Sequence, residues 1–75
     1  MPKATGFSRF TFGRSIRAAR EKLGLSQEAF AERANVHRTY ISSVELGKVS
    51  VGIEVANALA HALGLKLSEL VRRCE

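Results

Sequence analysis

Four polar residues in the middle of the chain have types and spacing suited to reading DNA. Arg38 and Ser42, like Thr39 and Ser43, are four residues apart, so on a helix all four side chains share one face. A guanidinium can donate two parallel hydrogen bonds to O6 and N7 of guanine, and a threonine can bring its methyl group to thymine or its hydroxyl to phosphate. The spacing therefore predicts a helix edge that enters the major groove.

Two short helices joined by a tight turn are predicted around this edge, over residues 25–47. Ser26 is the predicted N-cap of the first helix, and Asn35 tolerates the left-handed conformation that ends it. Gly47 is predicted to end the second helix. Apolar residues recur at helical spacing on both sides of the turn: Phe30, Ala31, Ala34, Val36, Ile41 and Val44.

The pattern L-S-Q-E-x-x-A-E-R-A-x-V-x-R-T-Y-I-S-x-x-E-x-G resembles the phage-repressor (Cro- or Xre-type) helix-turn-helix family. Within that family it is most similar to the small controller proteins of restriction–modification systems, which share R-T-Y-I-S. The resemblance runs from about Phe12 to Val71 and implies an all-α, five-helix, lambda-repressor-like DNA-binding domain. We therefore expect a basic N-terminal arm over residues 1–11, the domain over 12–73 with its helix-turn-helix at about 26–46, and a tail at 74–75.

The resemblance also assigns roles to individual residues. Arg20 and Glu45 stand where the family has a largely buried ion pair, and we interpret them as a structural pair that fixes the reading helix. Gln27 matches a glutamine that contacts backbone phosphate, as expected at a helix N-terminus. His37 replaces a serine or aspartate cap, which leaves two interpretations open: a weaker cap or a further contact to DNA. Arg38 remains the principal expected base reader.

The expected DNA contacts divide into two groups. Those to bases are Arg38, Thr39, Ser43 and His37, and those to phosphate are Gln27, Tyr40, Ser42, Lys48 and Ser50. The loop K-V-S-V-G at 48–52 departs from the family pattern, in which a basic or amide residue precedes a proline. Val49 and Val51 occur there instead, which indicates either a thinner set of DNA contacts or a surface for another protein.

The net charge of +5 is unevenly distributed. Residues 1–38 hold eight Lys and Arg against three Glu, whereas residues 39–75 hold four of each. A basic half next to a neutral half is typical of nucleic-acid binding, although many basic proteins bind nothing specific.

The remaining helices are predicted from apolar periodicity. The first runs from Thr11 or Phe12 to Leu23, with Phe7 or Phe10 of the preceding arm packed against the core, or with the arm following the DNA backbone. A fourth helix is expected over residues 53–63. Four apolar residues near the C-terminus exceed what so small a core needs, so they predict a twofold homodimer interface: Leu65, Leu67, Leu70 and Val71. The alternative is that these residues only close the core of a monomer.

Several function classes are disfavoured. The sequence has no nucleophile–base pair, paired carboxylates or phosphate-binding glycine loop, so we expect no enzyme and no cofactor. Two histidines, His37 and His61, and the single Cys74 offer no metal site. There is no apolar run of about 20 residues and no secretory signal, so we expect a cytoplasmic, nucleoid-associated prokaryotic protein without a membrane partner.

The leading hypothesis is a sequence-specific transcriptional regulator that binds an inverted repeat in double-stranded DNA as a homodimer. Repression is the expected mode, with activation through contact with RNA polymerase or another protein at other promoters. The alternative is a protein-interaction module built on the same fold, such as an antitoxin or an anti-activator that sequesters its partner. Val49 and Val51 favour the alternative, whereas the arginine and hydroxyl edge of the third helix favours DNA binding.

Overall fold

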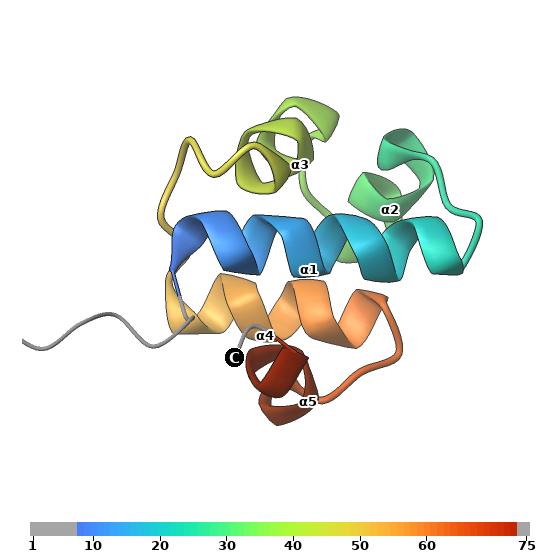
Figure 1. Cartoon of the computed structure of the whole chain (residues 1–75). Helices are drawn as coiled ribbons and strands as arrows, with labels where there is room; N and C mark the ends of the chain where they lie inside the picture. The colour runs from blue at the N-terminus through green and yellow to red at the C-terminus, as the bar shows by residue number, and fades with distance from the viewer. Residues whose placement is uncertain (1–7, 74–75) are drawn as a thin grey trace, which may run out of the picture.

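The computed structural model describes residues 8–73, which form five helices and no strand in that range. In chain order they are α1 (Arg9–Lys22), α2 (Gln27–Ala34), α3 (Arg38–Glu45), α4 (Ile53–Ala62) and α5 (Leu67–Arg73). The long α1 lies in the middle, with α2 and α3 on one side and α4 and α5 on the other (Figure 1). The predicted all-α, five-helix fold is confirmed.

α1 begins earlier than predicted. Ser8 is its N-cap, and Ser8 and Thr11 form a capping box in which each side chain accepts a hydrogen bond from the other residue's backbone N–H. Residues 8–11 therefore belong to the folded domain rather than to the arm. Phe10 is 55% exposed, and its ring lies against Gly47 at the end of α3. The predictions for the rest of the arm and for the tail lie outside the described residues.

The two helices of the helix-turn-helix form as their local sequence predicts. The hydroxyl of Ser26 accepts a hydrogen bond from the backbone N–H of Ala29 at 3.0 Å. Asn35 ends α2 in the left-handed conformation, with φ 57° and ψ 44°. This turn sends the chain directly into α3, whose apolar side packs against both α1 and α2.

One hydrophobic core joins all five helices. It consists of Phe12, Ile16, Ala19, Phe30, Ala31, Ile41, Val44, Ala56, Leu59, Ala60, Leu63 and Leu70. Leu70 is completely buried, so it closes this core and cannot itself form a dimer surface, which corrects the prediction for that residue. Leu23, the predicted last residue of the first helix, is 51% exposed, because α1 ends at Lys22 and Leu23 is its C-cap.

Close packing of α1 against α3 depends on Gly13. A Cβ atom at this position would lie 2.2 Å from the backbone oxygen of Val44 and 2.9 Å from that of Glu45. The absence of a side chain thus allows the end of α3 to rest on the α1 backbone. None of the helices within residues 8–73 is both long and apolar enough to cross a membrane.

Candidate nucleic-acid interface

α3 has one apolar face, which is buried, and one polar face, which is accessible to solvent. Ile41 and Val44 are buried, whereas Arg38 and Thr39 are exposed and Ser42 and Ser43 are half-buried. The predicted polar edge therefore exists on a single helix, and its arginine and hydroxyl groups are accessible. Tyr40 is half-buried and packs against the core, so only part of this side chain can reach a ligand.

His37 is the N-cap of α3. Its Nδ1 accepts a hydrogen bond from the backbone N–H of Thr39 at 3.2 Å. Because Nδ1 is the acceptor, the neutral ring carries its proton on Nε2. The structure thus supports the capping interpretation, and the exposed ring retains an N–H donor at the start of the polar edge.

An ion pair fixes the other end of α3. Arg20 on α1 donates from Nε to Oε2 of Glu45 at 2.6 Å and from Nη2 to Oε1 at 3.0 Å. Its Nη1 also donates to the backbone carbonyl of Leu25 at 2.8 Å. This bond attaches the segment between α1 and α2 to the same ion pair. The side chains are only 11% and 3% exposed, so the predicted structural pair is present and nearly buried.

The charge state of this pair follows from its hydrogen bonds. The bond to Glu45 raises the pKa of Arg20 above its ordinary value, while burial acts in the opposite direction. The contact with Glu45 thus favours the charged form of Arg20, which a guanidinium already holds at neutral pH. Removing either partner would leave a buried charge without compensation.

Gln27 extends this network to the start of α2. Its amide nitrogen Nε2 donates to Oε1 of Glu45 at 3.1 Å, a contact that the sequence analysis missed. An amide nitrogen has two protons, so this bond leaves one for a second acceptor. Glu45 thereby orients the side chain that the family resemblance assigns to phosphate contact. Nothing local in the sequence indicates a bond between residues so far apart.

In the loop after α3, exposed residues alternate with residues that pack against the core. Lys48 and Ser50 are exposed beside the end of α3, as a phosphate contact would require. Val49 and Val51 are half-buried and pack against the hydrophobic core. The two valines thus have a structural role within this chain, which weakens the idea that they form a surface for another protein.

The positions expected to contact DNA come from three places along the chain. Gln27 begins α2, residues 37–43 include the cap and exposed edge of α3, and Lys48 and Ser50 follow its end. Among the described residues, no group of three His, Cys, Asp or Glu side chains is arranged to hold a metal ion. The arrangement offers donors and hydroxyls on a projecting helix rather than groups converging on a reacting atom.

Comparisons with known proteins agree with this geometry. A family model described as helix-turn-helix matches residues 16–70. The chain is 43% identical over 60 residues to the control protein C.MunI of a Mycoplasma species, covering 79% of this chain and 81% of that protein. It is 36% identical over 64 residues to the control protein C.BamHI of Bacillus amyloliquefaciens, covering 84% and 79%.

A solved structure shows the same arrangement. The crystal structure of the restriction–modification controller protein C.AhdI from Aeromonas hydrophila superimposes with a TM-score of 0.80. The two sequences are 35% identical, and the match covers 83% of this chain and 94% of that one.

Proposed function

Because this chain belongs to the helix-turn-helix family of DNA-binding transcriptional regulators, we propose that it binds an inverted-repeat operator as a homodimer and represses the promoter there. Activation would follow where the bound protein contacts RNA polymerase or another protein. Such a protein works in the cytoplasm, on nucleoid DNA. The observation that supports the proposal best is the exposed polar edge of α3, held at both ends by His37 and by the Arg20–Glu45 pair.

Arg38 is the proposed principal base reader. It is exposed at the first position of α3, and a bidentate contact to guanine gives strong discrimination between base pairs. Thr39 and Ser43 lie along the same edge with shorter reach, and His37 presents Nε2–H beside them. These residues are the proposed base contacts.

The proposed phosphate contacts surround this edge. Gln27 lies at the N-terminus of α2, where free backbone N–H groups favour an anion. Tyr40 and Ser42 lie on α3, and Lys48 and Ser50 on the loop that follows it. Contacts on both sides of α3 would fix its register on the duplex without reading sequence.

The homodimer is proposed to form through apolar residues around α5. Leu65, Leu67 and Val71 are each half-buried, so part of each side chain remains open to a partner. In a homodimer bound to an inverted repeat, the two α3 helices would enter successive major grooves, with half-sites about 34 Å apart. Analytical ultracentrifugation of Leu67→Lys should then give a monomer, and a dimer of unchanged affinity would exclude this surface.

The experiment that tests the proposed function is selection of bound duplexes from a random pool at two salt concentrations. An inverted repeat with a guanine in each half-site is expected. Motif-free binding that falls steeply with salt would mean that the basic half contacts only phosphate, and the proposal would fail.

Arg38→Ala tests the residue assignment on the selected duplex. The loss of one bidentate contact is expected to cost about 1–3 kcal/mol and to relax preference at one base pair. Arg33→Ala is the matched control, because Arg33 is an exposed arginine near the end of α2 and outside the α3 edge. Equal losses in the two variants would show that only net charge matters.

A further inference from the structure

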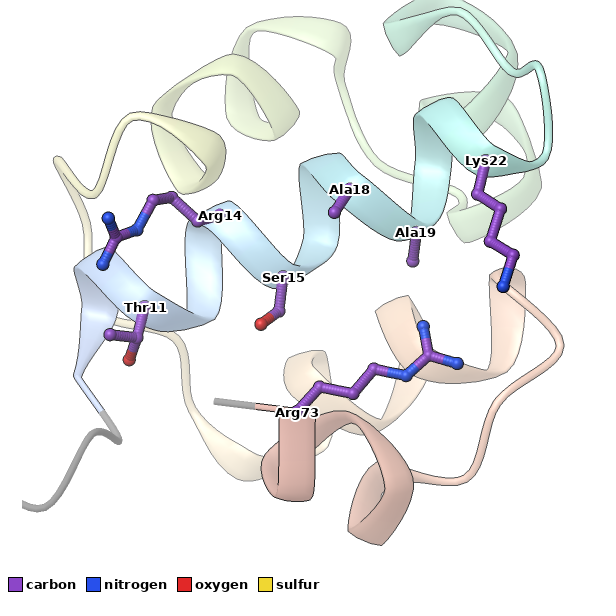
Figure 2. Close-up of a pocket in the computed structure, with 7 residues that line it drawn as sticks. All are labelled: Thr11, Arg14, Ser15, Ala18, Ala19, Lys22 and Arg73. Atoms are coloured by element: carbon purple, nitrogen blue, oxygen red, sulfur yellow. The ribbon is translucent and has the colours of Figure 1, made fainter. Parts of the chain in front are cut away.

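A hollow on the side of α1 away from α3 has no role in the proposed DNA interface. It has a volume of about 460 Å³ and is lined by Thr11, Arg14, Ser15, Ala18, Ala19, Lys22 and Arg73 (Figure 2). Thr11, Ser15 and Ala18 follow one another at helical spacing along one face of α1. Their small side chains leave space between α1 and α5, which forms the hollow.

The hollow carries uncompensated positive charge. Arg14, Lys22 and Arg73 are all exposed, and no carboxylate among the described residues lines the space. Figure 2 shows Lys22 and Arg73 reaching into the gap from α1 and from α5.

Two other cations on α1 are neutralised by carboxylates, whereas the guanidinium of Arg9 lies 5.1 Å from the centre of the Phe10 ring. Arg17 pairs with Glu21 at 3.2 Å, and Arg20 pairs with Glu45 at 2.6 Å. Within residues 8–73, none of the three cations of the hollow has an ion pair. Three cations without an ion pair therefore line one groove.

The spacing of the cations indicates the shape of their ligand. Arg14 and Lys22 are eight residues apart on α1, which is about 12 Å along the helix axis. A single phosphate group cannot contact both ends of such a groove. An extended peptide covers that distance with about four residues and can direct one carboxylate to each end.

We propose that this groove, formed by α1 and α5, docks an extended acidic segment of a partner protein. Lys22 and Arg73 would hold one carboxylate, and Arg14 would hold a second near the other end. The polar Thr11 and Ser15 and the small Ala18 allow the peptide backbone to approach α1 closely.

The groove is compatible with simultaneous DNA binding. α3 packs on one side of α1, whereas α5 packs on the other side (Figure 1). With α3 in a major groove, the groove between α1 and α5 would lie away from the duplex, and its residues are distinct from Leu65, Leu67 and Val71, the proposed dimer contacts around α5. The proposal is independent of the operator and of the identity of the base reader.

The test uses fluorescence anisotropy with a labelled hexaglutamate peptide and the full chain. In the variant K22A/R73A, affinity for the peptide should fall about tenfold, as expected for two solvent-exposed charge contacts. The matched control is K66A/R72A, which removes the same net charge from exposed positions outside the groove. Its affinity should stay within about twofold of the parent.

Three results would overturn the proposal. Equal weakening in both variants would show that the peptide responds only to net charge. Displacement of the peptide by inorganic pyrophosphate at equal or lower concentration would identify a compact phosphate as the preferred ligand. A tenfold loss of DNA affinity in K22A/R73A but not in K66A/R72A would assign the groove to the DNA backbone. Circular dichroism on each variant establishes that it is folded.

Discussion

Replacing Gly13 by alanine sets two opposing effects against each other. Gly13 is within α1, where alanine is intrinsically favoured over glycine by up to about 1 kcal/mol. Considered as an isolated helix, α1 would be stabilised. In the folded chain the new Cβ would lie 2.2 Å from the backbone oxygen of Val44, whereas ordinary contacts are 3.4–4 Å.

The packing effect should dominate. The two atoms that a Cβ at Gly13 would meet most closely are backbone oxygens, which cannot rotate away as a flexible side chain can. The end of α3 would have to move by about 1 Å, and overpacking of this kind costs about 1–3 kcal/mol. After the gain in helix propensity, the expected net loss is up to about 2 kcal/mol, or a decrease in Tm of up to about 16 °C for a domain of this size.

The measurements are urea unfolding followed by circular dichroism, and a gel-shift titration on the folded variant. Gly52→Ala is the control, because nothing lies within 4 Å of a Cβ there and the position is the N-cap of α4. It should change stability by about 0.5 kcal/mol. A Gly13→Ala protein at least as stable as the parent, with unchanged DNA affinity, would refute the reasoning that Gly13 sets the position of α3.

Three further substitutions test the parts that hold and surround α3. Glu45→Ala should lower the free energy of unfolding by about 3–5 kcal/mol, because it leaves the nearly buried charge of Arg20 without a carboxylate; a urea midpoint equal to that of the parent would contradict this. His37→Ala should cost about 1 kcal/mol by removing the N-cap, and His37→Asn should restore it, as thermal unfolding of both would show. Lys48→Ala should weaken DNA binding equally for all sequences and reduce the slope of log affinity against log salt by about 1; a change in base preference would argue against a phosphate contact.

Much of the helix-turn-helix was predictable because its signals are local. Ser26 bonds to a backbone group three residues away, and Asn35 adopts its left-handed conformation through its own side-chain properties. The family resemblance is confirmed by the matching family model, and it also supplied the Arg20–Glu45 pair. The capping box of Ser8 and Thr11 is equally local, so the sequence alone contains the signal for the start of α1 at Arg9.

By itself, then, the sequence determined the helices, the turn and the polar edge of α3, since each depends on residues a few positions apart. Only the tertiary structure decided what depends on how distant helices approach one another. Gly13 matters because α3 rests on α1, and Gln27 bonds to Glu45 because α2 and α3 meet at that point. Likewise, Leu70 could face a partner or the core, and the packing of α5 against α1 and α4 placed it inside.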